Sequence, residues 1–290
     1  MQIEESIRDW TKLGSDDLKD EIRNRKIRPL NKSVIAMWTT LFVLAALSIY
    51  TMLTIDSKNV NLVQAVADTF SNFREMFLYP VSVHLTWWEA FLEVGITLGL
   101  AFLTTLFGGV AALFLGLLAA QNLSNKTATV FIKGFIAVIR AVPTILWVLI
   151  FAVAAGLGSA AAVIGMTFHS ISYLTKAYGE SFEDLDKSVI EALKASGANW
   201  WQIVFQAVIP SSLTFLLSWT FIRFEINFAN AVAMGAAAGA AGIGFDLFMA
   251  SEFYFDLREV GLITYIILAF AILLETVSTN LKGRIKNHQI

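Results

Sequence analysis

Long apolar stretches alternate with short polar ones along this chain. About 20 apolar residues are enough for a helix to cross the hydrocarbon core of a bilayer. The pattern therefore predicts an all-α fold, a polytopic membrane protein with six transmembrane helices. We expect these helices at residues 34–53, 91–120, 130–157, 160–178, 211–232 and 260–281.

The polar stretches predict three regions: an amphipathic segment (1–32), a first span with an external loop (33–90) and a transmembrane core (91–285). The first region carries eight Lys and Arg residues and the C-terminal tail three more, whereas loop 54–90 has only Lys58 and Arg74. Basic residues favour the cytoplasmic side of a membrane. We therefore expect both termini, and the polar stretch 179–210, to be cytoplasmic.

Composition agrees with a membrane protein, because 57% of the residues are hydrophobic and 15% are charged. Soluble domains average about a quarter charged residues. The net charge of −2 gives no sign of nucleic-acid binding, and the lack of cysteine excludes disulfides and thiolate metal sites. No second ligand stands at metal-binding spacing from His169, and no Ser-His-Asp ordering suggests an enzyme, so we expect neither a metal site nor catalysis.

Residues 179–210 predict a polar helical hairpin between two spans. Leu185, Val189 and Leu193 recur every four residues and predict an apolar stripe on the first helix. Residues 196–199 permit a tight turn, and a second helix is expected from Trp200 to Pro210, where the next span opens. Spacing alone leaves open whether this hairpin has a partner.

The hairpin resembles the "EAA" loop of type I ABC importer permeases. That pattern is Glu-Ala-Ala, three residues, Gly, nine residues, Ile, one residue, Leu-Pro. The spacing is kept, with identity at Glu191, Ala192, Gly197 and Pro210 and apolar replacements at the other positions, which are Leu193, Ala207 and Ile209. The resemblance implies that a cytoplasmic ABC ATPase dimer, which would bind ATP-Mg, docks here, and that this chain binds no cofactor itself. The coupling residues implied are Glu191, Ala192, Ala195, Ser196, Gly197, Ala198, Asn199, Trp200 and Pro210.

The resemblance extends over about residues 90–285 and is strongest to permeases of phosphonate importers, whose relatives carry phosphite or related oxyanions. One departure is Ala229, where a second basic residue is expected. The family implies a bacterial cell-membrane subunit, a second copy forming a homodimer and an extracytoplasmic substrate-binding protein. Another small anionic or polar solute remains an alternative cargo, and an ion-coupled secondary transporter is a further one. The matching residues are 120–123, Arg140, Ala141, 156–158, His169, Lys176, Glu180, Glu183, 223–225, Asn227 and the glycines of 235–244.

Arg223, Glu225 and Asn227 interrupt the fifth apolar stretch. A charge at mid-membrane costs about 2.5–3.5 kcal/mol, so it must face protein, water or a partner charge. Residues two apart diverge by about 200° on a helix, so Arg223 and Glu225 need not pair. Arg223 is either part of an interhelical polar clamp or a donor to a passing oxyanion.

Arg140 and His169 are two further candidates for the translocation pathway. Arg140 lies beside Pro143, which should kink its helix, and it either lines the pathway or extends to the interface. His169 is either a buried, satisfied histidine or a substrate ligand.

Residues 231–244 are almost all small. Irregular backbone at membrane depth must be buried or line a cavity, and small residues let helices approach closely. We predict either a re-entrant gate loop or a tight packing surface there. The glycines concerned are Gly235, Gly239, Gly242 and Gly244. No Gly-Lys-Ser/Thr follows, so this is not a nucleotide site.

Overall fold

The computed structural model describes residues 32–54 and 61–287, so the predicted amphipathic segment at the N-terminus lies outside the described residues. Every regular element in the described ranges is helical, which confirms the all-α prediction. The chain divides into two compact units, residues 1–65 and 66–290. The first unit contains α2 (Lys32–Thr54), which is apolar around its whole circumference and has no buried residue. Such a helix suits a lipid environment.

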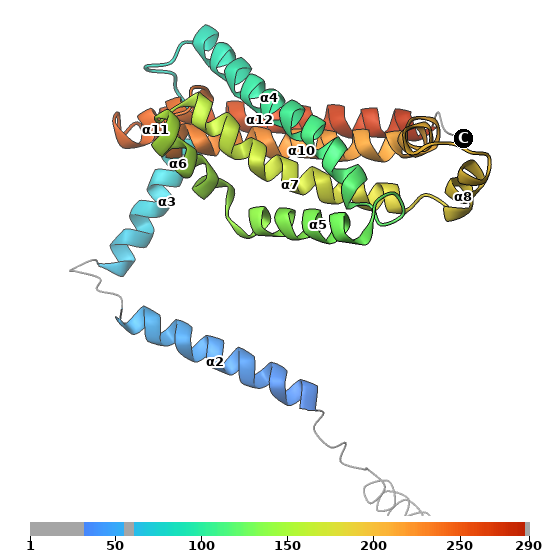
Figure 1. The fold of residues 1–290 in the computed structure, drawn as a ribbon. Coiled ribbons are helices and arrows are strands. Elements are labelled where there is room, and N and C mark those ends of the chain that lie inside the picture. The colour runs from blue at the N-terminus through green and yellow to red at the C-terminus, as the bar shows by residue number, and fades with distance from the viewer. Residues whose placement is uncertain (1–31, 55–60, 288–290) are drawn as a thin grey trace, which may run out of the picture. The chain divides into compact units, whose positions relative to one another are not determined.

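The second unit is a bundle of long helices with shorter ones at its ends (Figure 1). Its helices begin with α3 (Leu62–Leu78), which contains the boundary between the units, and continue with α4 (Trp87–Ala119), α5 (Lys126–Ala141), α6 (Thr144–Ala155), α7 (Ser159–Glu183), α8 (Lys187–Ala195), α9 (Trp200–Ile203), a π-helical turn (Val204–Val208), α10 (Ile209–Ala238), α11 (Ile243–Glu252) and α12 (Leu257–Asn287). Helices α8 and α11 lie at opposite ends of this bundle, which we call the hairpin end and the α11 end (Figure 1).

Helix α7 lies in the middle of the bundle, packed against α4, α5, α6 and α10. Its approach to α4 depends on small residues at every fourth position, namely Gly108, Ala112 and Gly116. A Cβ on Gly108 would lie 2.6 Å from the Cβ of Ser170, so only glycine permits this contact. Small residues at this spacing let membrane helices pack backbone to backbone.

Four segments are long and apolar enough to cross a membrane, judged over the described residues: α2, α4, the continuous stretch Trp200–Ala238 and α12 over Leu257–Gly283. The pair α5 and α6 makes a fifth candidate, bent by 88°. Helix α7 is long enough but less apolar, because it faces protein and buries Ser170, Ser172 and Thr175. All six predicted segments are therefore helical, and the crossing of the membrane by all six stays a prediction.

The predicted third span, 130–157, is two helices and not one kinked helix. Pro143 stands directly before α6, where it has no N–H to continue the ladder of α5. The chain turns by 88° at this break. This bend is larger than a proline kink within one helix would be, and it lets α6 pack across α7. The backbones of the two helices are in close contact, because a Cβ on Gly165 of α7 would lie 2.5 Å from Val148 Cα of α6.

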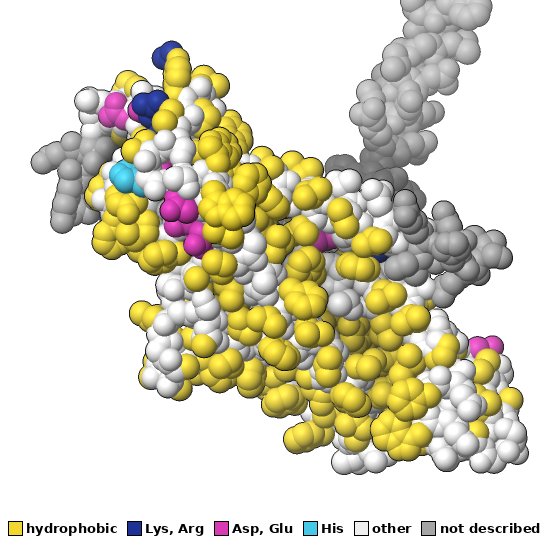
Figure 2. Space-filling model, turned by 90° about the horizontal axis from the view of Figure 1, so that it is seen from above, with side chains coloured by type: hydrophobic (Ala, Val, Ile, Leu, Met, Phe, Trp, Pro, Cys, Tyr) yellow, Lys and Arg dark blue, Asp and Glu magenta, His cyan; other side chains and the backbone are white. Residues whose placement is uncertain are grey.

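The surface of the bundle is apolar over most of its area. Figure 2 shows hydrophobic side chains covering the middle of one face, with charged ones concentrated near one end. Large exposed apolar residues occur on α4, α5 and α10 alike, for example Phe102, Phe131 and Phe215. Such a surface suits lipid or a partner subunit.

Candidate functional site

The polar hairpin is built by two helix caps around one glycine. The Asp186 side chain accepts a hydrogen bond from Ser188 N at 2.9 Å and starts α8; this bond holds the pKa of the Asp186 carboxyl below its usual value. After α8, Gly197 adopts φ +85°, a left-handed conformation that favours glycine. Asn199 then starts α9 through a reciprocal capping box with Gln202, whose backbone N–H donates to Asn199 Oδ1 at 2.9 Å. The predicted turn thus has a defined conformation.

Two details of the predicted hairpin are wrong. The second helix does not end at Pro210, because α9 continues through the π-helical turn into α10. Pro210 has no N–H to donate, and the turn before it accommodates this: Ile209 N bonds to Val204 O, five residues back. The apolar stripe is also shifted, since Ile190 is buried while Val189 is 41% exposed. Leu185 and Leu193 do pack on the core, as expected.

The tip of the hairpin is open around Gly197, whereas Ala198 and Trp200 beside it pack on the core. A Cβ built on Gly197 has no atom within 4 Å. Most of the predicted coupling residues are exposed at or near this tip, and Ala198 and Trp200 are half-buried. Pro210 is also exposed, but it lies on α10 and not in the turn. The exposed ones at the tip are Glu191, Ala192, Ala195, Ser196, Gly197 and Asn199.

Trp200 ties the hairpin to the loop between α4 and α5. Its indole Nε1 donates to Leu123 O at 2.9 Å. The same loop is held to the end of α7, because Gln121 N donates to Glu183 Oε1 at 2.8 Å. That carboxylate oxygen also pairs with Lys133 Nζ of α5 at 2.9 Å. The hairpin is therefore connected, through this loop and its bonds, to α4, α5 and α7.

Arg223 and Asn227 belong to one buried polar network in the middle of the bundle. Arg223 Nε donates to Ser170 Oγ at 3.0 Å, and Asn227 Nδ2 donates to Ser170 Oγ at 3.0 Å and to Thr105 Oγ1 at 2.9 Å. Arg223 is 2% exposed, and its guanidinium lies 5.2 Å from the centroid of the Tyr173 ring. The network joins α4, α7 and α10, which favours the clamp interpretation of Arg223.

We expect Arg223→Ala to destabilise the protein by about 2–4 kcal/mol, because it opens a cavity and removes a buried hydrogen bond. Thermal unfolding of the purified chain in detergent measures this effect. Arg140→Ala, which removes an exposed arginine, is the matched control and should leave the unfolding midpoint unchanged. Slower transport with unchanged unfolding in Arg223→Ala would instead identify Arg223 as a substrate contact.

The other three pathway candidates make no side-chain hydrogen bond to this network in the described part of the chain. Glu225 faces α12, where its Oε1 lies 4.0 Å from Lys282 Nζ, so it does not pair with Arg223, in agreement with the helical spacing. His169 is half-buried on α7, and its Nδ1 is buried without a hydrogen-bond partner in the described chain. Arg140 is exposed at the end of α5. The five candidates therefore do not form one cluster.

Arg140 lines a cavity of about 280 Å³ between α5 and α7. Lys133, Lys176, Glu180 and Glu183 line the same cavity. These residues were not predicted as a site, although a signal was present: charges spaced four or seven residues apart share one face of a helix. Their assembly across two helices could not be seen from the sequence.

The four glycines of 231–244 have separate roles. Gly235 lies inside α10 and Gly244 inside α11, so most of this stretch is regular helix and not an irregular loop. The two helices touch here, since a Cβ on Gly244 would overlap the Val232 carbonyl. Only Gly239 (φ +61°) and Gly242 (φ +115°) lie in the short connection. The arrangement favours the packing interpretation over a gate loop.

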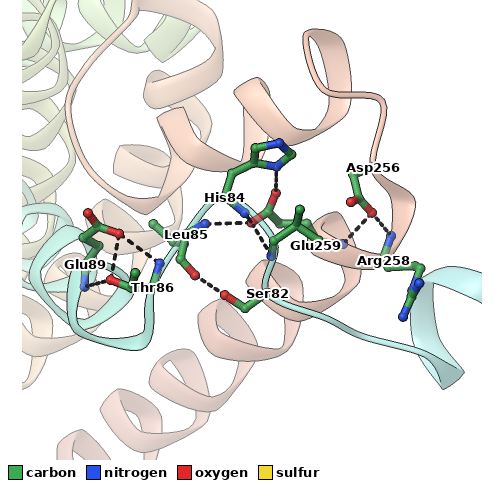
Figure 3. A network of polar contacts seen from close by, with 9 residues as sticks. Ser82, His84, Leu85, Thr86, Glu89, Asp256, Arg258 and Glu259 are labelled. Carbon is green, nitrogen blue, oxygen red and sulfur yellow. Dashed lines mark hydrogen bonds and ion pairs between the residues drawn. The ribbon is translucent and has the colours of Figure 1, made fainter.

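At the α11 end, a carboxylate fastens the loop before α4 to α12 (Figure 3). Glu259 is 1% exposed; its Oε1 accepts from the backbone N–H groups of Val83, His84 and Leu85, and its Oε2 lies 2.7 Å from His84 Nδ1. Among the described residues, His84, Asp256 and Glu259 are close enough to share a metal ion. Glu259 is already fully engaged by protein donors, so we interpret the cluster as a structural clamp. The sequence could not predict it, because its partners are about 175 residues apart.

A bundle of apolar spans around a buried polar network, with a capped polar hairpin at one end, defines a polytopic membrane protein. The family described as "Binding-protein-dependent transport system inner membrane component" matches residues 112–287, more than half of the chain. The chain belongs to this family, and the resemblance to importer permeases is confirmed.

Two of the similar proteins are named for the transport of phosphorus oxyanions. The chain is 30% identical over 191 residues to the phosphite transport system permease protein PtxC of Stutzerimonas stutzeri, which covers 66% of this chain and 69% of the relative. It is 29% identical to the phosphate-import permease protein PhnE of Mycolicibacterium smegmatis, in an alignment of 186 residues that covers 63% of this chain. The match spans only about a third (35%) of the length of that second relative.

The fold is also similar to a solved transporter. An inward-facing structure of the MetNI methionine ABC transporter superposes with a TM-score of 0.61 at 20% sequence identity. The superposition covers 66% of this chain and 94% of the matched chain of that transporter. At this identity the likeness concerns the fold alone.

Proposed function

We propose that this chain is the membrane subunit of an ATP-driven importer for a phosphonate or a related phosphorus oxyanion. In this proposal, two copies enclose the pathway, an ATPase dimer supplies the energy, and an extracytoplasmic binding protein delivers the substrate. Both termini and the hairpin end would be cytoplasmic and the α11 end would face outward. All six predicted spans would cross the bilayer.

The open tip of the hairpin is the observation that carries this proposal. It is capped at both helix ends, open around Gly197 and tied through Trp200 to the loop between α4 and α5. A surface connected to those helices suits a contact through which an ATPase does mechanical work on the pathway. The family membership supports a transport role, and the names of the relatives support the cargo class.

Cross-linking tests the docking directly, because the chain has no cysteine of its own. Ala195→Cys places a thiol on the exposed end of α8 without removing a side-chain hydrogen bond. We expect this variant to cross-link to the ATPase subunit in the assembled transporter. Val83→Cys, exposed at the α11 end, is the control and should not react with that subunit. Cross-linking at Val83 and not at Ala195 would contradict the proposed orientation.

A further inference from the structure

Charged side chains form two facing rows along the groove between α5 and α7. Lys133 and Arg140 are seven residues apart on α5, so they share a face over about 10 Å. Lys176 and Glu180 share a face of α7 and lie 3.6 Å apart. Both rows line the 280 Å³ cavity, and a second cavity of about 130 Å³ continues it past Arg140 to Tyr173 and Trp219.

The groove differs from the rest of the exposed surface of α5. On other sides that helix exposes Phe131 at 72% and Val138 at 65%, which suit lipid. Lys176 and Glu180 have side chains exposed at 51% and 61%. Because a charge facing hydrocarbon is costly, we expect the charged side of α5 to face water or a partner subunit. The groove is thus suited to a water-filled path.

The groove has a small excess of positive charge, because three basic residues and two carboxylates line it. Glu183 is engaged by Lys133 and by the backbone of Gln121. Arg140 has no carboxylate partner within the described part of the chain. Behind the groove wall, Tyr173 stacks on the buried guanidinium of Arg223, whose Nη2 has no hydrogen-bond partner there. A dianion in the groove would therefore lie near the unpaired Arg140 and near Lys176, which Glu180 holds loosely. Arg223 would add a third positive charge from behind the wall.

We infer that Arg140 and Lys176 bind the transported oxyanion in this groove. The inference rests on the proposed function and names the residues of the pathway that select negative charge. Arg140 offers a fork of donors that matches two phosphoryl or phosphonyl oxygens. Lys176 leaves its ion pair with Glu180 to bind the substrate and re-forms that pair when the substrate departs. This competition keeps substrate binding weak enough for release. Arg223 acts as a positioning residue: its guanidinium holds the Tyr173 ring in place. Its positive charge also attracts the solute without contacting it.

Thiol chemistry in the cysteine-free chain tests the sign of the charge in the groove without knowledge of the substrate. Ala137→Cys lies in the groove, and its neighbour Val138→Cys lies on the apolar side of the same helix. We expect Cys at position 137 to react with water-soluble methanethiosulfonates. The ratio of its rate with the anionic ethylsulfonate to its rate with the cationic trimethylammonium reagent should exceed the same ratio for free cysteine in solution, because a thiolate by itself favours the cationic reagent. Position 138 should be protected by detergent or lipid.

Adding Arg140→Gln to the Ala137→Cys chain should lower the anion-to-cation rate ratio by about fivefold to tenfold, because it removes a unit charge close to the thiol. The same change at Lys194, an exposed lysine of α8 in the hairpin, should alter the ratio less than about twofold, because screening acts over about 10 Å. An anion-to-cation rate ratio at position 137 no higher than that of free cysteine, or an unchanged ratio in Arg140→Gln, would overturn the inference.

A phospholipid headgroup carries the same kind of oxyanion as the proposed solute, so binding of lipid and binding of solute are tested in separate experiments. In micelles of an uncharged detergent, millimolar phosphite or methylphosphonate should slow modification at position 137, and Lys176→Gln should abolish this protection. Protection by phosphatidylglycerol alone would assign the groove to lipid and overturn the inference. Because the cross-link at position 195 is measured independently, loss of anion preference with the cross-link retained would reject the groove and leave the proposed function standing.

Discussion

Replacing Gly197 by aspartate should abolish uptake while the assembled transporter continues to hydrolyse ATP. The residue has φ +85°, where a side chain is strained, and the open space around it places the new carboxylate at the proposed ATPase contact. An unpaired charge buried at an interface costs about 2–5 kcal/mol, and even the lower value corresponds to about thirtyfold in affinity. Uptake and ATP hydrolysis, measured together in reconstituted vesicles, report the loss of coupling.

Gly156→Asp is the matched control for backbone strain. Gly156 has φ +83° and also has no atom within 4 Å of a built Cβ, but it lies in the connection between α6 and α7, away from the hairpin. Strain alone would affect both variants, whereas loss of docking affects Gly197→Asp only. Normal uptake in the Gly197 variant would contradict the coupling role of the hairpin.

Gly244→Ala should cause a large loss of stability for the addition of a single methyl group. The new Cβ would overlap the Val232 carbonyl oxygen, and backbone cannot move aside as a flexible side chain can. Overpacking costs about 1–3 kcal/mol, and a rigid neighbour favours the upper end of that range. The midpoint of thermal unfolding in detergent and the yield of monodisperse protein measure this effect.

Gly99→Ala provides the comparison within α4. No atom lies within 4 Å of a Cβ built there, and alanine is a better helix former than glycine by about 1 kcal/mol. This variant should therefore be as stable as the parent chain or more stable. An unfolding midpoint for Gly244→Ala equal to that of Gly99→Ala would show that α10 and α11 do not pack through Gly244.

The polar hairpin was largely predictable because its determinants are local. Gly197 permits the left-handed turn, and Asn199 with Gln202 forms a cap within four residues. What could not be predicted is how it connects to the bundle. The bond from Trp200 to Leu123 joins residues 77 apart, and no periodicity encodes it.

Charged residues within spans were recognised from the sequence, but their partners were not. The sequence alone does not distinguish a clamp role of Arg223 from a substrate contact, and the fold brings it to Ser170, 53 residues away. The sequence places Arg140 near Pro143, whereas the structure places it across a groove from Lys176. A helix fixes the face on which a side chain lies, and only tertiary packing fixes what that face meets.

The sequence by itself determined that this protein is all-α, where its apolar helices run and where the hairpin turns, because these depend on hydrophobic length and on local backbone chemistry. Tertiary structure alone decided that α7 is central despite its polar residues, that Glu259 clamps the loop at residues 83–85, and that two rows of charge face each other across α5 and α7. These features depend on contacts between residues far apart in the chain, which form only when the helices have packed.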